Sequence, residues 1–211
     1  SFTLVSQTST GVCPRTVTRT YSIADSCGNV SSCTQVFTVN DNISPSITCP
    51  AGTTVECFGN LPVAYITLVQ FTLAGGSATD NCGINAASFT LVSQTSTGVC
   101  PRTVTRTYSI ADSCGNVSNC TQAFTVNDNI LPTITCPAGT TVECFGNLPV
   151  AYTTLVQFTA AGGTASDNCG INGNTFTLVS QTSSGVCPRL VTRTYSIADS
   201  CGNLSSCAQA F

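Results

Sequence analysis

The chain has 211 residues and a formal net charge of −3, with six arginines, nine acidic residues, and neither lysine nor histidine. Such sparse positive charge argues against nucleic-acid binding, which depends on neutralising phosphates. Without lysine or histidine, no Ser-His, Cys-His or lysine nucleophile can be assembled, so we expect no enzyme. No stretch of about 20 apolar residues predicts a membrane span, and any export signal is expected to lie outside these residues.

One unit of 87 residues recurs along the chain. Residues 1–45 and 88–132 differ at only three positions, and 175–209 repeats 1–35 with small changes. A period this long exceeds that of solenoid units, so each copy is expected to close its own core. We predict three domains in what we expect to be a window on a longer polymer: 1–42, the C-terminal half of a first repeat; 43–129, a complete second repeat; and 130–211, a third repeat.

The first half of the complete repeat predicts short elements. Residues 46–49 and 53–57 are β-branched runs interrupted by a Pro-Ala-Gly segment, which is typical of a broken first strand. Residues 67–74 predict a short helix, with Thr67 as the N-cap and the glycine pair at 75 and 76 as the stop.

The second half predicts strands. Residues 88–94 and 103–110 alternate apolar and polar side chains with period two. Residues 113–116 form a turn signal, and 120–126 resumes extended structure, so the last two strands are expected to form a hairpin. The predicted fold class is therefore all-β, a tandem series of small disulfide-rich antiparallel β-sandwiches, each with one short helical segment.

Fifteen cysteines are distributed as three in the first half-repeat and six in each of the next two. Zinc sites usually contain close cysteine pairs and often histidine, and this chain has neither. Six cysteines per repeat allow three disulfides, which predicts an oxidising, extracellular location.

Four segments of the complete repeat resemble the motifs of the hyalin repeat family. They are ITCP at 47–50, DNC at 80–82, IADSCGN at 110–116, and the run from Cys120 to Asn129. The resemblance implies an immunoglobulin-like sandwich in an extracellular adhesive protein, including the long repeat-rich surface adhesins of gliding and related bacteria. Cys100, Cys114 and the inserted segment 65–76 depart from the family pattern.

The immunoglobulin-like arrangement implied by this resemblance sorts the cysteines between two ends of a copy. Cys57 and Cys100 share the trailing end and are predicted to pair. Cys49, Cys82, Cys114 and Cys120 share the leading end, where Cys82–Cys114 with Cys49–Cys120 is favoured and exchanged partners remain an alternative. The third repeat is expected to follow the same rule, with Cys144–Cys187, Cys169–Cys201 and Cys136–Cys207. Every predicted bond lies inside one repeat, which leaves Cys13, Cys27 and Cys33 without partners.

Three acidic positions per repeat are also expected at the leading end. They are Asp41, Asp80 and Asp112, repeated as Asp128, Asp167 and Asp199. The segment from Val39 to Pro45 resembles the calcium-binding linker of cadherins, and calcium takes six to eight oxygen ligands. The favoured interpretation is that these Asp residues form turns by bonding their own backbone; calcium at the inter-repeat linkers is the alternative.

Asn29, Asn116 and Asn203 fit the N-glycosylation sequon at the same hairpin of each copy. The same asparagines fit a Gly-Asn turn, so both interpretations are open.

These observations predict a structural repeat region of an extracellular filament or cell-surface adhesin that acts as a stiff, disulfide-stapled spacer. The expected partners are neighbouring copies of the repeat and other chains in a bundle or fibre. The alternative is a multivalent module in which each repeat binds a glycan or protein surface weakly, and exposed tyrosines would favour it.

Overall fold

The computed structural model describes all 211 residues and is all-β with short helices. In chain order the strands and helices are β1 (Phe2–Thr10), β2 (Arg15–Ala24), β3 (Val30–Val39), β4 (Ser46–Thr48), β5 (Thr54–Val55), η1 (Phe58–Asn60), α1 (Leu68–Leu73), β6 (Ser77–Thr79), β7 (Ile84–Thr97), β8 (Arg102–Asp112), β9 (Val117–Val126), β10 (Thr133–Thr135), η2 (Phe145–Asn147), α2 (Leu155–Ala160), β11 (Thr164–Ser166), β12 (Ile171–Ser184), β13 (Leu190–Asp199) and β14 (Leu204–Ala210). The predicted all-β, sandwich-like fold class is confirmed.

The chain divides into two compact units that combine residues of neighbouring sequence copies. Unit 1 contains Ser1–Ala51, Val63–Thr95 and Thr105–Ala123; unit 2 contains Gly52–Pro62, Ser96–Val104 and Phe124–Phe211. Each unit therefore encloses the junction between two sequence copies, and we describe each unit by itself.

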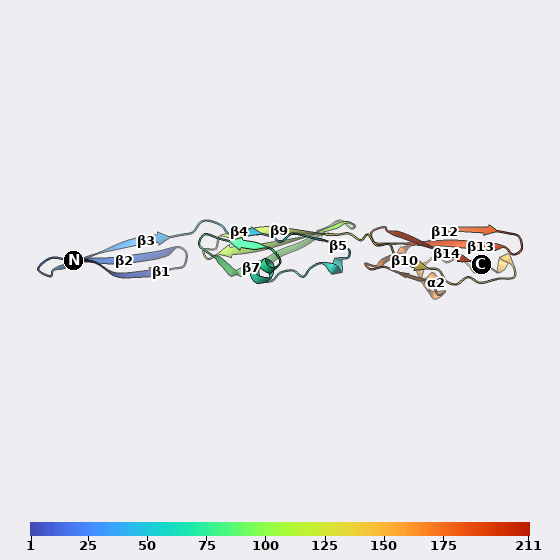
Figure 1. The fold of residues 1–211 in the computed structure, drawn as a ribbon, viewed down its shortest axis with the longest axis horizontal. Helices are drawn as coiled ribbons and strands as arrows, with labels where there is room; N and C mark the ends of the chain where they lie inside the picture. Colours follow the sequence, from blue (N-terminus) through green and yellow to red (C-terminus); the bar gives the residue numbers. More distant parts are fainter. The chain divides into compact units, whose positions relative to one another are not determined.

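Unit 1 contains the antiparallel sheet β1-β2-β3 and the hairpin of β8 with β9 (Figure 1). Its core is formed by Phe71, Phe89, Tyr108 and Ile110, with β4 and β6 contributing Ile47 and Ala78 at its margin. Along β8, buried residues alternate with more exposed ones, which confirms the period-two prediction for this strand.

The short helix α1 is stabilised mainly by its packing. Thr67 is its N-cap, and its hydroxyl accepts a hydrogen bond from the Gln70 amide, as predicted. Gly75 follows the helix with a positive φ of 96°, a conformation that glycine adopts without strain. Because six residues form only a marginal helix alone, the fully buried Phe71 ring provides most of the stabilisation.

Unit 2 repeats this arrangement with β10, β11 and α2 beside the sheet β12-β13-β14 (Figure 1). Its core contains Phe158, Phe176, Tyr195 and Ile197, the repeat equivalents of the core residues in unit 1. A second small core of Val104, Phe124 and Val126 lies where β5 pairs with β9 in parallel. The predicted break in the first strand is thus confirmed, because β4 pairs with β6 and β5 with β9.

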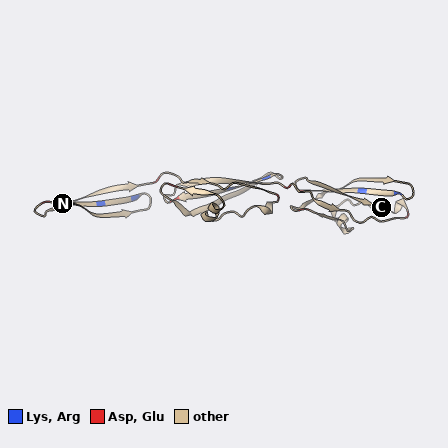
Figure 2. Cartoon of the chain, viewed as in Figure 1, with Lys and Arg blue, Asp and Glu red and all other residues tan.

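Figure 2 shows how few charged residues the chain has, with the blue of arginine confined to short stretches such as those in β2 and β13. No helix of the chain is long and apolar enough to cross a membrane.

Candidate functional sites: disulfides and acidic clusters

Two disulfides close within a single sequence copy. Cys49 bonds to Cys120 and Cys136 bonds to Cys207, each with a Cα separation of 5.6 Å. All four cysteines pack against the aromatic cores. These two predicted pairs are confirmed, and each bond ties the segment after the first short strand to the last long strand of its copy.

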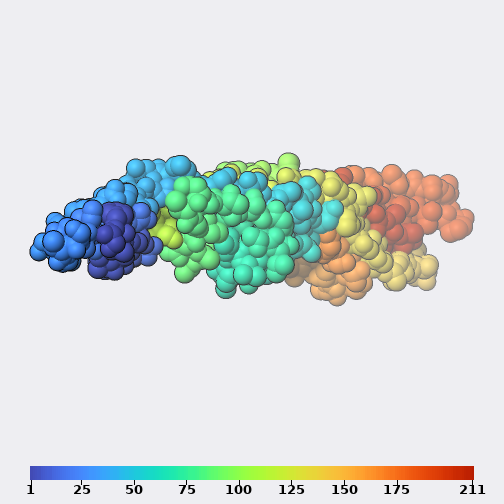
Figure 3. All heavy atoms as spheres, turned by 60° about the vertical axis from the view of Figure 1, so that its left-hand side comes forward, coloured from blue at the N-terminus to red at the C-terminus, as the bar shows by residue number.

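Three other disulfides join neighbouring copies. Cys13 bonds to Cys114 and Cys100 to Cys201, with Cα separations of 5.0 and 5.1 Å, and Cys57 bonds to Cys169 at 5.2 Å. The first two bonds are equivalent, since both of their ends shift by 87 positions. In Figure 3, yellow-green atoms from the region of the β8–β9 turn lie against blue atoms from the start of the chain, as the Cys13–Cys114 bond requires.

The predicted pairs Cys57–Cys100 and Cys82–Cys114 are therefore wrong, as are Cys144–Cys187 and Cys169–Cys201 and the exchanged alternatives at the leading end. These pairs are wrong because the trailing end of one copy lies against the leading end of the next copy. The two cysteines predicted for that end, Cys57 and Cys100, both bond to leading-end cysteines of the next copy rather than to one another. Cys13 also has a partner, contrary to prediction.

Five cysteines carry exposed free thiols: Cys27, Cys33, Cys82, Cys144 and Cys187. Each is the repeat equivalent of a cysteine that is bonded elsewhere in the chain. Cys82 corresponds to Cys169, for example, and Cys144 corresponds to Cys57. The predicted involvement of Cys82, Cys144 and Cys187 in bonds within their own repeats is thus wrong.

The first acidic cluster lies in unit 1 and contains Asp41, Asp80 and Asp112. One carboxylate oxygen from each lies within 4.8 Å of those of the others. The residues come from the linker before β4, the loop between β6 and β7, and the end of β8. The structure thus brings together the three acidic residues that the sequence placed at the leading end.

Each of these carboxylates also stabilises a local turn. Asp41 Oδ1 accepts from the Ile43 amide at 3.1 Å. Asp80 Oδ2 accepts from the amides of Cys82 and Gly83 at 2.8 and 3.0 Å. Asp112 Oδ1 accepts from the amides of Cys114 and Asn116 at 2.7 and 2.9 Å. The predicted turn role is therefore confirmed.

The electrostatics of this cluster reflect its hydrogen bonds. Burial favours protonation of Asp112, but hydrogen bonds from the side chain and backbone of Asn116 outweigh it and lower the pKa of the carboxyl. Burial, reinforced by the Asp41 carboxylate, raises the pKa of the Cys82 thiol.

The second acidic cluster lies in unit 2 and groups Asp128 and Asp167 with the sulfur of Cys169. Burial raises the pKa of Asp128, and the charges of Asp167 and Asp199 raise it further. Asp199 itself resembles Asp112, because hydrogen bonds from Asn203 overcome burial and lower its pKa. Cys169 is bonded to Cys57, so its sulfur is not a thiolate and the carboxylates dominate the cluster.

Asn116 is an anchor that the sequence did not reveal. Its side-chain nitrogen donates to the Asp112 carboxylate at 2.6 Å, the Asp41 carbonyl at 3.0 Å and the Ile43 carbonyl at 3.4 Å. Asn203 repeats the first two contacts through Asp199 and the Asp128 carbonyl. The signal available in the sequence was the recurrence of Asn after the turn glycine, which fitted both a Gly-Asn turn and a glycosylation sequon.

The same nitrogen is the atom that a glycan modifies. In Asn116 and Asn203 it already bonds the turn carboxylate and the linker, whereas in Asn29 it bonds only the exposed Asp25 carboxylate. Glycosylation of these positions stays a prediction.

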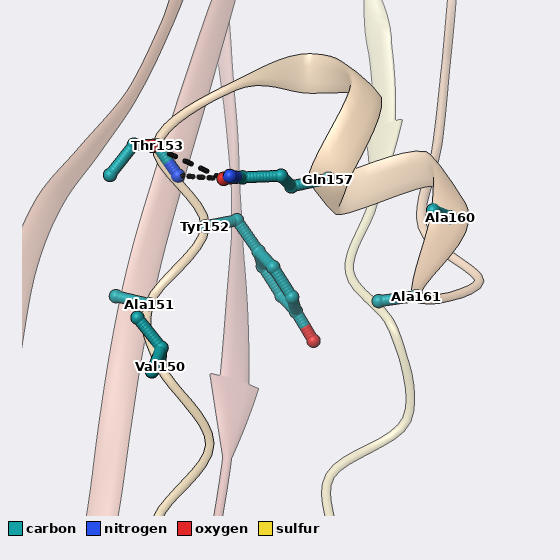
Figure 4. Close-up of a pocket in the computed structure, with 7 residues that line it drawn as sticks. All are labelled: Val150, Ala151, Tyr152, Thr153, Gln157, Ala160 and Ala161. Carbon is teal, nitrogen blue, oxygen red and sulfur yellow. Dashed lines mark hydrogen bonds between the residues drawn. The ribbon is translucent and has the colours of Figure 1, made fainter.

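A shallow pocket beside α2 contains little chemistry for binding. Figure 4 shows that it is lined by Val150, Ala151, Tyr152, Thr153, Gln157, Ala160 and Ala161. Gln157 Oε1 accepts hydrogen bonds from the amide and the hydroxyl of Thr153, so its polar end is already used. The Tyr152 ring packs at 5.9 Å from Phe158 and 5.5 Å from Tyr195, measured between ring centroids, and serves the core.

No protein-family profile matches the chain, and no curated protein matches it significantly.

Proposed function

We propose that the chain is a structural repeat region of an extracellular filament or cell-surface adhesin, in which disulfides between copies make the spacer resistant to extension. The observation that carries the proposal is the trio of bonds Cys13–Cys114, Cys57–Cys169 and Cys100–Cys201. An enzyme or a single binding domain has no evident need for bonds that overlap from one copy to the next.

The overlap of these bonds defines a short covalent path. Tension that enters at Cys13 crosses to Cys114, returns along the backbone to Cys100, and crosses to Cys201. Cys100 and Cys114 are fourteen positions apart (114 minus 100), whereas Cys13 and Cys201 are 188 positions apart (201 minus 13). Only the segment that contains β8 is therefore loaded, and the remaining backbone is bypassed.

The bypass limits how far the chain can be stretched. Fully extended backbone spans roughly 3.3–3.6 Å per residue, so the fourteen loaded positions reach about 50 Å. Without the bonds, the 188 positions between Cys13 and Cys201 would reach about 650 Å. The maximal extension depends little on the stability of the fold, because the disulfides remain intact even where the domains unfold.

The free thiols are also expected to form disulfides between copies. Because each is the repeat equivalent of a bonded cysteine, we expect each to bond to a further copy of the repeat, in the same chain or in a second one. Five disulfides favour an oxidising, extracellular setting. The motifs that resemble the hyalin repeat family favour the same setting.

Multivalent glycan or protein binding is supported less well. It would benefit from exposed aromatic platforms, but Tyr108 is fully buried and Tyr65 is partly covered by Phe71. No specific observation favours this alternative.

Single-molecule pulling tests the proposal directly. With handles at Ser1 and Phe211, we expect the oxidised chain to stop extending once the flanks and the β8 segment are straight. Reductant should then release the bypassed 174 positions (188 minus 14), which adds about 600 Å of contour length. An oxidised chain that extends as far as the reduced one would contradict the load path, and a native object that is a compact particle would contradict the filament or adhesin role.

A further inference from the structure

We propose that the carboxylates of Asp41, Asp80 and Asp112 bind a calcium ion, and that those of Asp128 and Asp167 form a second, related site. This inference stands independently of the load path, because it rests on oxygen atoms rather than on disulfides. Each site would join the linker that precedes a copy to the loop of that copy that carries Asp80 or Asp167.

The first argument is that two carboxylate oxygens of the cluster accept no hydrogen bond from the turns. Asp41 is only 8% exposed, and its Oδ2 is buried without a hydrogen-bond partner. Asp80 Oδ1 is likewise buried and without a partner. Turn formation explains Asp41 Oδ1 and Asp80 Oδ2 but not these two atoms.

Burying an unpaired charged oxygen is strongly unfavourable, and buried charges in proteins are normally paired or coordinate metals. The hydrogen bonds that the cluster does receive come from backbone amides and asparagine side chains, which are neutral donors. A cation between Asp41 and Asp80 would satisfy both leftover oxygens and offset the repulsion among the three carboxylates.

The second argument is that the pattern recurs in unit 2. Asp167 Oδ2 accepts from the amides of Cys169 and Gly170, while its Oδ1 is buried without a partner. Asp128 is 4% exposed and its Oδ1 accepts from the Ile130 amide, so the unpartnered oxygen that recurs in unit 2 is that of Asp167.

The types of ligand atom at these sites favour calcium. The unit 1 cluster consists of carboxylate oxygens, the chain has no histidine, and the Cys169 sulfur in the unit 2 cluster is committed to a disulfide, whereas the free Cys82 thiol lies beside Asp41 in unit 1. Zinc and other softer metals prefer nitrogen and sulfur, whereas calcium takes six to eight oxygens in flexible geometry. The carboxylates supply the charge, and Asn81 Oδ1, backbone carbonyls and water supply the remaining positions. Calcium modules of extracellular proteins bind with dissociation constants on the order of 10⁻⁴ to 10⁻³ M, which is the range we expect.

The test is calorimetric titration of the oxidised chain with calcium chloride, with magnesium chloride in a parallel run. We expect two calcium ions per chain, and calcium to bind at least tenfold more tightly than magnesium. Asp80→Asn should remove one ion, Asp167→Asn the other, and the double variant both. Asparagine keeps an oxygen for the turn amides, and its NH2 group can donate to the leftover oxygen of Asp41 or Asp128. Each variant should therefore fold without calcium.

The chain supplies a matched control in Asp25, the repeat equivalent of Asp112 in the first copy. Asp25 makes the same turn bonds to the amides of Cys27 and Asn29, but it belongs to neither cluster. Asp25→Asn should leave both calcium ions bound. Absence of binding to folded wild-type chain at about 10 mM calcium, ten times the weak end of the expected range, would overturn the proposal. Binding that survives the double variant, or that magnesium matches, would overturn it equally.

Discussion

The two junctions between sequence copies have the same acidic residues but different covalent bonds. In unit 1 one disulfide, Cys13–Cys114, crosses the junction, and Cys82 is free. In unit 2 two disulfides cross it, Cys57–Cys169 and Cys100–Cys201. Both junctions nevertheless bring a linker aspartate beside a loop aspartate. The acidic cluster therefore forms without the Cys57–Cys169 type of bond, and hydrogen bonds contribute to its geometry alongside the Cys13–Cys114 bond.

The asparagine after the turn glycine provides those bonds. At both junctions its side chain connects the turn carboxylate to the carbonyl of the linker aspartate, at 3.0 Å for Asn116 and 2.9 Å for Asn203. The disulfides thus add covalent strength to a junction that polar contacts already define.

The largest effect on stability should come from removing the Cys57–Cys169 disulfide, which has no counterpart at the first junction. The double variant Cys57→Ser with Cys169→Ser opens a bond between residues 112 positions apart. The loop-entropy treatment assigns such a bond about 4–5 kcal/mol of unfolding free energy. We expect the denaturant midpoint of unit 2 to fall accordingly while the acidic cluster remains assembled.

Cys82→Ser is the control for that variant, because Cys82 is the free equivalent of Cys169. Replacing an exposed free thiol should change the unfolding free energy by less than about 0.5 kcal/mol. Equal effects of the two substitutions in guanidinium chloride unfolding would mean that the extra bond does not stabilise the junction.

The sequence predicted what local chemistry determines. Alternation in residues 103–110 identified β8, and Thr67 with the following glycines identified α1. The pair Cys49–Cys120 followed from the immunoglobulin-like arrangement that the resemblance to the hyalin repeat family implies. The gathering of Asp41, Asp80 and Asp112 followed from their common end of the copy.

The sequence did not predict the bonds between copies, and its periodicity is the reason. Cys82 and Cys169 lie in the same local sequence, DNCGIN, so nothing near Cys57 distinguishes closure within its copy from closure to the next. That choice depends on the long-range packing of one copy's leading end against the trailing end of another. The leftover oxygens of Asp41 and Asp80 were also beyond sequence, because they appear only when burial is known.

A smaller effect on stability should distinguish the linker contacts of Asn116 from its hydrogen bond to the turn carboxylate. Asn116→Ala removes the donor to the Asp112 carboxylate and to two linker carbonyls, and a hydrogen bond to a charged group contributes about 1.5–3 kcal/mol. Asn29→Ala removes only the exposed bond to Asp25, which solvent screens, so we expect a smaller loss of stability than for Asn116→Ala. Urea unfolding of both variants measures the difference, and equal losses would show that the linker contacts contribute nothing.

The smallest expected effect is on the pH dependence of stability, to which Asp112 and Asp128 should contribute with opposite signs. The lowered pKa of Asp112 means that its stabilisation is present at neutral pH and is lost as pH falls through the folded value. The raised pKa of Asp128 has the reverse consequence, because ionisation above that pKa costs the folded state stability. In chelator at pH 7, Asp112→Asn should therefore lower the melting temperature and Asp128→Asn should raise it.

The difference for Asp128→Asn should shrink at pH 3, below its raised pKa, whereas the difference for Asp112→Asn should shrink only as pH falls toward the lowered pKa of Asp112. Added calcium separates this proton effect from the metal effect. If Asp128 is a ligand, its substitution should become destabilising once calcium is present, since the variant loses the ion that offsets the cost of the ionised wild-type group. A melting-temperature difference for Asp128→Asn that calcium leaves unchanged would show that protonation alone balances this carboxylate at the junction.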